Sequence, residues 1–284
     1  MMLELFATEL VRIDRLLADD RNLTIPEAMR TIPLEVFGEL LLGVPEQLPA
    51  LAARLPSMPA DQVQRNWTGN HGMPLMVQSL AFVRTLLGLW GRQARRGIDS
   101  ASILDFGCGW GRLLRLLLHA VPEPALHGVD SWSESIRLCQ ESGLRCPLAV
   151  SEEVPTTLPF RGPFDLIFSF SVFTHLSEQT ARTVLATLRQ VVREDGLLCL
   201  TIRPIEYWRQ WGGSGFEDYE ARHREQGFAF LPHRRTPTAA GDISYGDTSL
   251  TLDHLQRLAP DWRIVQVEWT GHDPLQVIVA LQPT

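Results

Sequence analysis

The stretch Ile103–Arg115, which reads ILDFGCGWGRLLR, constrains the fold of this chain more than any other. Its apolar start, which closes with Asp105 and a phenylalanine, predicts a buried parallel strand. The three glycines that follow, Gly107, Gly109 and Gly111, suit a turn that visits positive φ and that a ligand approaches without meeting a Cβ. The sequence therefore predicts a strand, a glycine turn and a helix whose first N–H groups face an anion.

The spacing of these glycines decides which ligand the turn suits. A dinucleotide-binding turn has the pattern G-x-G-x-x-G, which would place its third glycine at Arg112. The pattern here is D-x-G-x-G-x-G, and it resembles the first motif of the class I S-adenosylmethionine-dependent methyltransferases. In that family the acid closes strand 1 and the loop holds the methionine end of S-adenosyl-L-methionine. The resemblance implies a set of cofactor-binding residues: Asp105, Gly107, Cys108, Gly109, Gly111 and Arg112.

A second acidic residue, Asp130, ends the short predicted strand 126–130. Dinucleotide and S-adenosylmethionine folds use an acid at this place to accept hydrogen bonds from the ribose hydroxyls. The alternative role is a cap for the helix that follows, which Ser131 or Ser133 could fill equally well. With the glycine motif upstream we favour the ribose role, assign Ser131 to the cofactor as well, and place Trp132 at the adenine edge.

Two further stretches extend the resemblance. Residues 146–150 predict strand 3, after which the family places adenine contacts, so that Ser151, Glu152 and Glu153 are candidates. Residues 164–176 resemble the family's F-D-L-I-x-S-x-S-V-x-x-H-L stretch and predict strand 4 with its outgoing turn. We assign Ser169 to the cofactor. The Asn/Asp-Pro-Pro-Tyr signature of amino methyltransferases and an acid for a divalent metal are both absent here, which favours a metal-free enzyme.

His175 is the candidate general base because it follows strand 4 and because imidazole titrates near neutral pH. His233 and Tyr245 are held in reserve for the same role. A histidine in such a place also commonly orients a loop or caps a helix.

Composition excludes several kinds of chemistry. All 26 basic residues are arginine, so a Schiff-base lysine, a P-loop lysine and a kinase-type lysine are excluded. The net charge of −7 argues against nucleic acid as a partner. The four cysteines lack zinc spacing and predict buried thiols in a reducing compartment. The acidic N-terminus and the lack of an apolar run approaching about 20 residues predict a cytoplasmic protein without a membrane span.

The order of the elements predicts an α/β fold with a Rossmann-like, doubly wound sheet of mostly parallel strands. Residues 262–269 and 275–281 are joined by so short a link that they form a C-terminal antiparallel hairpin. Helical periodicity, with a helix start at Thr24 to Glu27 and a second run from 27 to 42, predicts that residues 1–72 form a helical N-terminal extension, either packing support or a cap over the site. A long helix from 75 to 96 opens the methyltransferase domain, 73–284, and the resemblance covers about 75–284.

Residues 204–248 break the alternation of strands and helices and form an insertion rich in glycine and aromatic side chains. Because the insertion leaves the carboxyl end of strand 5, it falls on the ligand side of the sheet and suits a lid and substrate pocket. The alternative is that its aromatic residues form a small core of their own. The candidate substrate-binding residues are Trp67 and His71 in the loop 66–74, and Tyr207, Trp208, Trp211, His233 and Tyr245 in the insertion.

The resemblance implies methyl transfer from S-adenosylmethionine, most simply a metal-independent O-methylation of a small molecule or sugar in a biosynthetic pathway. N-methylation is the alternative reaction, and a non-catalytic S-adenosylmethionine-binding protein is the alternative class. A nicotinamide oxidoreductase is disfavoured by Arg112 and by the terminal hairpin. The expected partner is a small-molecule or glycan acceptor.

Overall fold

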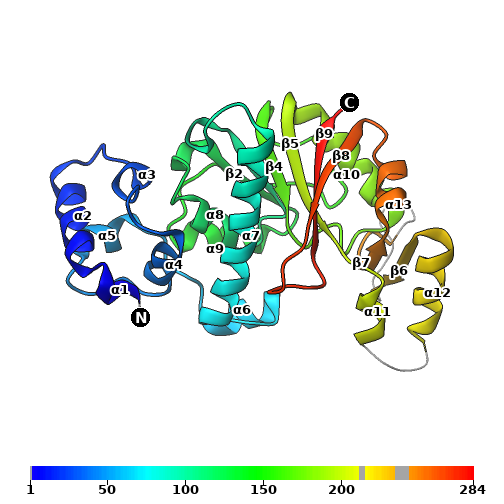
Figure 1. Ribbon diagram of the computed structural model, residues 1–284, viewed down its shortest axis with the longest axis horizontal. Helices are drawn as coiled ribbons and strands as arrows, with labels where there is room; N and C mark the ends of the chain where they lie inside the picture. Colours follow the sequence, from blue (N-terminus) through cyan, green and yellow to red (C-terminus); the bar gives the residue numbers. More distant parts are fainter. Residues whose placement is uncertain (1, 211–214, 234–242) are drawn as a thin grey trace.

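The computed structural model describes residues 2–210, 215–233 and 243–284, and a seven-stranded sheet forms its centre (Figure 1). The strands lie in the order β3-β2-β1-β4-β5-β9-β8. The first five are parallel to one another, whereas β9 is antiparallel to both β5 and β8. The predicted sheet with its terminal antiparallel hairpin is therefore confirmed. The strands are β1 (Ile103–Phe106), β2 (Leu126–Asp130), β3 (Leu148–Val150), β4 (Phe164–Ser169), β5 (Val192–Ile202), β8 (Trp262–Glu268) and β9 (Val277–Pro283).

Side chains alternate along the strands and so divide the core into two halves, one on each face of the sheet. In β1, Ile103 belongs to one half and Leu104 to the other. Both faces are covered, as a parallel sheet requires, and ligands therefore approach at its carboxyl edge. The first half includes α7 (Gly72–Gln93), α8 (Arg112–Leu117) and α9 (Ser133–Glu141), and the second includes α10 (Glu178–Val191) and α13 (Leu252–Leu258); short 3-10 turns precede β1 and β2.

The helices before α7 pack against the core domain. Leu10, Ile13 and Phe37 belong to the same hydrophobic cluster as Leu116 of α8. Thr24 and Glu27 form the expected capping box, in which each side chain accepts a hydrogen bond from the other residue's main chain. The helices are α1 (Met2–Leu5), α2 (Ala7–Asp19), α3 (Ile25–Ala28), α4 (Leu34–Leu42), α5 (Pro49–Arg54) and α6 (Asp61–Thr68).

The predicted helix from 27 to 42 is wrong. The chain forms two helices there. Pro33 stands in an extended conformation immediately before α4, and because proline has no backbone N–H, a helix that begins before Pro33 cannot run through it.

Helix α7 corrects a second expectation. Its 22 residues make it long and apolar enough to cross a membrane by length and composition alone, with a mean hydropathy of 1.3 in its most apolar window. The expectation that the sequence has no apolar run approaching this length was therefore wrong. In the structure α7 lies along the sheet (Figure 1), and its Phe82, Val83 and Leu86 are buried in the core.

The insertion after β5 is a small structure of its own, at the right of Figure 1. It contains α11 (Glu206–Gln210), α12 (Glu217–Gln226) and an antiparallel pair, β6 (Phe228–Pro232) and β7 (Gly246–Leu250). The strand pair was not predicted. Tyr207 and Trp208 are buried against Phe216, Tyr219 and Leu231, so part of the insertion's aromatic content forms its own core.

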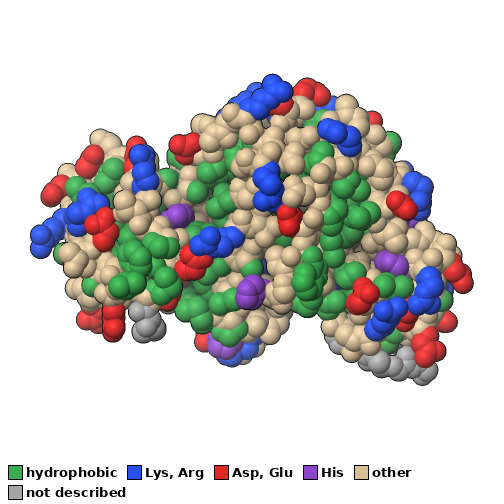
Figure 2. Space-filling view, viewed as in Figure 1, with side chains coloured by type: hydrophobic (Ala, Val, Ile, Leu, Met, Phe, Trp, Pro, Cys, Tyr) green, Lys and Arg blue, Asp and Glu red, His purple; other side chains and the backbone are tan. Residues whose placement is uncertain are grey.

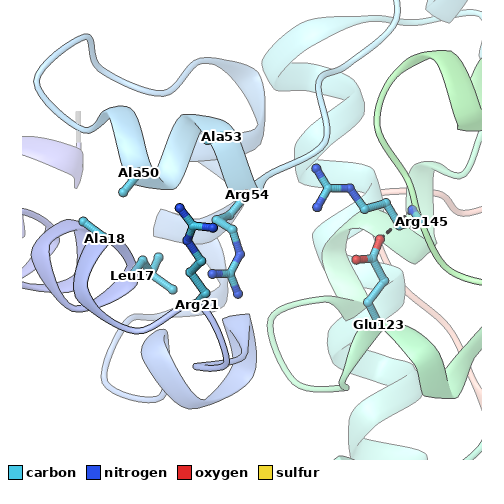
Figure 3. Close-up of a pocket in the computed structure, with 8 residues that line it drawn as sticks. All are labelled: Leu17, Ala18, Arg21, Ala50, Ala53, Arg54, Glu123 and Arg145. Atoms are coloured by element: carbon cyan, nitrogen blue, oxygen red, sulfur yellow. Dashed lines mark hydrogen bonds between the residues drawn. The ribbon is translucent and has the colours of Figure 1, made fainter.

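Charges of both signs are interspersed on the face shown in Figure 2, which presents no continuous basic surface. Arginines do gather at one hollow of about 450 Å³ between the N-terminal helices and the core (Figure 3). Arg21 and Arg54 come from the helical side, and Arg145 from the core side. Because Arg145 precedes β3, this hollow lies at the amino-terminal edge of the sheet, on the side away from the glycine turn.

Candidate functional site

The glycine turn after β1 has the geometry that its sequence predicts. The φ angles of Gly107, Gly109 and Gly111 are +80°, +54° and +76°. A Cβ on Gly107 would lie 2.3 Å from Val172 Cγ2, so that glycine is required by the packing of the protein itself. A Cβ on Gly109 would meet nothing closer than 3.8 Å, and Gly109 is the glycine that leaves room beside the turn.

Asp130 joins this turn to the one after β2. Its Oδ2 accepts a hydrogen bond from Gly109 N at 2.9 Å, and its Oδ1 accepts from Trp132 N and Ser135 Oγ, both at 2.9 Å. Asp130 therefore does bind the start of α9, as the capping interpretation predicts. A carboxylate has about four lone-pair sites, so the ribose interpretation remains compatible with these contacts and stays a prediction.

The residues around the turn differ in what they present. The side chain of Asp105 is buried, and this burial, aided by the nearby Asp130, raises the pKa of Asp105 well above its usual value. The Cys108 thiol is buried and contacts Cys139, so the assignment of Cys108 to the cofactor holds for its main chain at most. Ser131 is exposed at the end of β2.

Ser169 requires a correction. Its side chain is fully buried, and its Oγ donates a hydrogen bond to Phe106 O at 3.0 Å. The hydroxyl thus ties β4 to β1 inside the sheet and does not face a ligand.

Arg112 lies in a polar cluster that the sequence did not reveal. Its Nη1 donates to Gln78 Oε1 at 2.9 Å, and Gln78 Nε2 donates to Asp273 Oδ2 at 2.7 Å. Burial lowers the pKa of Arg112 to about 10, which leaves it charged at neutral pH, and burial raises the pKa of Asp273. The link between β8 and β9, which contains Asp273, therefore folds back onto α7, where Gln78 joins it to Arg112.

The same link brings Gln276 to the end of β4. Gln276 Nε2 donates to Ser171 Oγ at 3.0 Å, and Ser171 has a positive φ of 59°. Gln276 Oε1 is buried without a hydrogen-bond partner among the described residues. Such an acceptor beside a non-glycine residue in the left-handed region marks this place as a site for a donor group.

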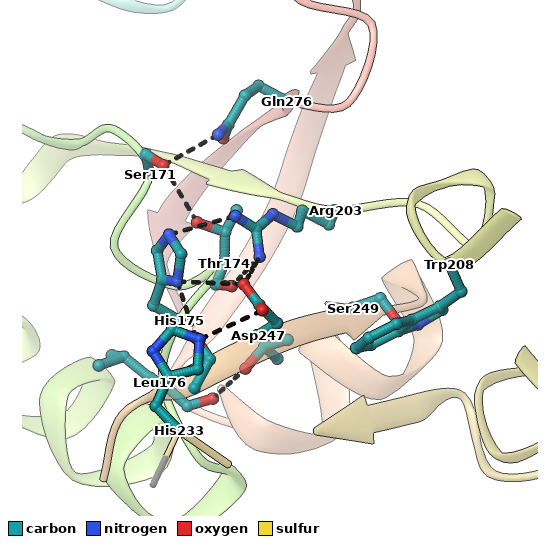
Figure 4. A network of polar contacts seen from close by, with 12 residues as sticks. Ser171, Thr174, His175, Leu176, Arg203, Trp208, His233, Asp247, Ser249 and Gln276 are labelled. Carbon is teal, nitrogen blue, oxygen red and sulfur yellow. Dashed lines mark hydrogen bonds and ion pairs between the residues drawn. The ribbon is translucent and has the colours of Figure 1, made fainter. Parts of the chain in front are cut away.

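His175 follows at the end of the same turn, and both of its ring nitrogens are engaged (Figure 4). Nδ1 lies 2.7 Å from Gly246 O, and Nε2 lies 3.2 Å from Arg203 Nη2. Because a guanidinium only donates, Nε2 is the acceptor and Nδ1 carries the proton. Burial, together with the positive charge of Arg203, lowers the pKa of His175 to about 4. The ring is therefore neutral at neutral pH, with its lone pair occupied.

Asp247 is the centre of this network. Its Oδ1 accepts from Arg203 Nη1 at 2.7 Å, and its Oδ2 lies 3.2 Å from Nε2 of His233. Burial opposes ionisation of Asp247, but the hydrogen bonds from Arg203 and His233 outweigh it, and the pKa of Asp247 is lowered. Tyr245 stacks on His175 with ring centroids 5.1 Å apart. The structure thus brings together the three base candidates, whereas Arg203 and Asp247 were missed because no motif marks them.

The remaining substrate candidates separate into different places. Trp208 is buried and donates to Ser249 Oγ at 2.6 Å, so it belongs to the core of the insertion and its assignment to the substrate was wrong. The Tyr207 ring is also buried and packs under the Arg203 guanidinium. His71 is held by Asp61 and Arg65 of α6. Trp67 lies at the glycine turn, and Trp211 lies outside the described residues.

The pKa of His175 predicts a pH dependence of stability. In the unfolded chain the ring has the ordinary pKa of about 6.5, and in the folded chain it has a pKa of about 4. Between these values the unfolded state binds the extra proton, so stability falls as the pH is lowered from about 6.5 to about 4, by at most about 3 kcal/mol. Denaturant unfolding across this range should show a steeper loss for the wild type than for His175→Asn.

The other histidines whose pKa is lowered by burial, His119, His127 and His223, titrate equally in both proteins and cancel in this comparison. Parallel curves for the wild type and His175→Asn would contradict the burial of a neutral His175.

Comparisons with known proteins agree with this geometry. Residues 103–196 match the family model described as a methyltransferase domain. Over 130 residues the chain is 30% identical to malonyl-[acyl-carrier protein] O-methyltransferase of Geobacter sulfurreducens, a match that spans 45% of this chain and 45% of that relative. The chain therefore matches less than half of the length of this relative.

Solved structures share the fold at low sequence identity. An S-adenosylmethionine-dependent methyltransferase from Clostridium acetobutylicum aligns with a TM-score of 0.50 and 11% identity, over 71% of this chain and 90% of that one. Magnesium protoporphyrin IX methyltransferase from Synechocystis PCC 6803 aligns with a TM-score of 0.51 and 12% identity, over 78% of this chain and 94% of that one.

Proposed function

We propose that this chain, whose sheet and glycine turn form a class I S-adenosylmethionine-dependent methyltransferase domain, methylates an oxygen atom of a hydroxylated small molecule or sugar. The observation that carries this proposal is the pair of His233 and Asp247, which lies beyond the carboxyl end of β4. A hydroxyl group must lose a proton during methyl transfer, whereas a neutral amine attacks with its own lone pair.

The residues at the turn fit S-adenosyl-L-methionine, the cofactor of this family. Gly109 leaves space at the turn, and Asp130 offers a carboxylate at its border. The unpartnered Gln276 Oε1 suits a donor such as an ammonium or hydroxyl group. When bound, the cofactor supplies a methyl group already activated by the sulfonium, so the chain has to align the acceptor and take its proton.

His233 is better arranged than His175 for the proton transfer. Because a carboxylate only accepts, the nitrogen of His233 that faces Asp247 carries a proton, and the other ring nitrogen is left as the base. This is the arrangement in which a buried acid fixes the tautomer of a catalytic histidine. The lone pair of His175, in contrast, is held by Arg203, so His175 acts as a positioning residue.

The chemistry of the network around His233 supports a polar acceptor. The network combines the Thr174 main-chain carbonyl with the His175 imidazole, the Arg203 guanidinium and the Asp247 carboxylate (Figure 4). Such groups hydrogen-bond a hydroxylated molecule and gain nothing from a purely apolar one.

An acceptor screen tests this proposal. Release of S-adenosylhomocysteine would be measured with sugars, phenols and carboxylic acids, each beside the analogue in which an amine replaces the reacting oxygen. We expect turnover with a hydroxylated member and little with its amine. Turnover with the amines alone would establish N-methylation, and cofactor binding without turnover across the panel would favour the non-catalytic alternative.

Asp130→Ala should weaken binding of S-adenosylhomocysteine by about 1.5–3 kcal/mol if the carboxylate holds the ribose. Calorimetry would measure the loss, with Gln140→Ala, at an exposed position on α9, as the control. Asp130→Asn keeps an acceptor for Trp132 N, and so separates the loss of charge from the loss of the cap. Unchanged affinity in both Asp130 variants would leave this residue with its capping role alone.

A further inference from the structure

Trp67 connects the N-terminal extension to the glycine turn. It lies near the end of α6, and its ring carbons Cε3 and Cζ3 are 3.8 Å from the position of a Cβ on Gly109. The same ring stacks on Trp132, with centroids 4.7 Å apart and planes inclined by 12°. Two tryptophans from distant parts of the sequence therefore form a parallel stack at the glycine of the turn where a Cβ would meet only the Trp67 ring.

Asp130 fixes the position of this stack. Its carboxylate accepts hydrogen bonds from Gly109 N and from Trp132 N. The residue that is predicted to bind the ribose therefore also holds the two main-chain segments beside the stack. Trp132 is 56% exposed, which is unusual for so large an apolar side chain. Its ring therefore contributes little to the hydrophobic core. An exposed aromatic face beside a polar anchor is the arrangement that binds a planar base.

Polar contacts hold α6 against the start of α7. Gln64 side-chain atoms bind Pro59 O and the main-chain N of Gly72, the first residue of α7, and His71, immediately before α7, binds Asp61 and Arg65. The link to α7 passes through Gly69 and Gly72, whose φ angles are +75° and +57° and around which a Cβ would meet nothing within 4 Å. These glycines serve the backbone of the link rather than any packing, and the link holds Trp67 at the glycine turn.

We propose that Trp67 and Trp132 form a slot for the adenine base, closed on itself in this structure and opened when the exposed Trp132 side chain turns aside to admit the base between the two rings. Rings with centroids 4.7 Å apart have no room for a third ring between them. When the base binds, the contact between the two tryptophans is therefore replaced by one contact from the base to each of them. This inference rests on the proposed use of S-adenosylmethionine and makes the N-terminal extension part of the cofactor site. It assigns Trp67 to the cofactor, where the sequence assigned it to the substrate.

Circular dichroism tests the slot independently of activity. Two stacked indoles couple their transitions and give an exciton couplet, which should be present in the ligand-free wild type and absent from Trp67→Phe and Trp132→Phe. Titration with S-adenosylhomocysteine should remove the couplet of the wild type in step with calorimetric saturation. A couplet that persists at saturation overturns the slot while leaving cofactor binding intact.

Affinity measurements complete the test. Trp67→Ala should weaken binding of S-adenosylhomocysteine and of adenosine by about ten- to a hundredfold, since a stacked base contributes about that much. Trp67→Phe should retain most of the affinity, and Gln62→Ala, at an exposed position on the same helix, should leave it unchanged. Equal affinity in Trp67→Ala and the wild type contradicts the slot. If the wild type binds neither ligand, the proposed function itself fails.

Discussion

Gly111→Ala should destabilise the protein by about 3 kcal/mol, whereas Gly109→Ala in the same turn should cost only about 1–2 kcal/mol. Both glycines have positive φ, and a Cβ in that region costs about 1–2 kcal/mol at either position. At Gly111 the Cβ would also lie 2.3 Å from Leu144 Cδ1 and 3.0 Å from Cys139 Sγ, and both of these side chains are buried. Overpacking of this kind adds about 1–3 kcal/mol.

Denaturant unfolding of the two variants, with unchanged slopes against denaturant, would measure the difference. Gly91→Ala, in the last turn of α7 with open space around the new Cβ, is the control and should not destabilise the protein. Equal losses of stability in Gly109→Ala and Gly111→Ala would mean that the backbone conformation alone, and not the packing of side chains behind the turn, determines the cost of a Cβ.

Much of the fold could be predicted from local sequence patterns. The apolar strand before Gly107, the acid at the end of β2 and the short link before β9 are each encoded within a few residues, and each lies where the sequence predicts. The N-terminal extension was assigned as helical but not placed, since only the tertiary structure brings Trp67 onto the glycine turn. The strand pair of the insertion was missed because β6 is apolar throughout and β7 is mostly polar, so neither shows the alternation of a half-buried strand.

The candidate functional site was harder to predict from the sequence than the fold. His175 was chosen by its position after β4, but its basicity depends on Arg203, which lies 28 residues further along the chain and is carried there by β5. Gln276 reaches the same place from the C-terminal hairpin. Ser169 shows the opposite error, since a hydroxyl at the end of a strand can be consumed by the neighbouring strand. A motif places a residue near a site, but the partners that set its chemistry come from elsewhere in the sequence.

His233→Ala should lower kcat by about 10²- to 10⁴-fold on a hydroxyl acceptor, because it removes the proposed base. Affinity for S-adenosylhomocysteine should stay close to that of the wild type, since His233 binds Asp247, whereas Gly109 of the glycine turn binds Asp130. Asp247→Asn should also lower kcat, by disturbing the tautomer of His233, but it breaks the ion pair with Arg203 as well and must be compared at equal folded fraction.

His175→Asn is the matched variant that separates the two candidate bases. His175 is neutral, and its acceptor nitrogen is held by Arg203, so its loss should disturb the position of Arg203 and lower kcat by less than about tenfold. Single-turnover rates with saturating cofactor would compare the variants without interference from product release. A larger loss in His175→Asn than in His233→Ala would return the role of base to His175 and require Arg203 to release it when the acceptor binds. If both variants retain most of kcat, no histidine of this network takes the proton, and alignment of the acceptor becomes the main source of catalysis, as expected for an amine.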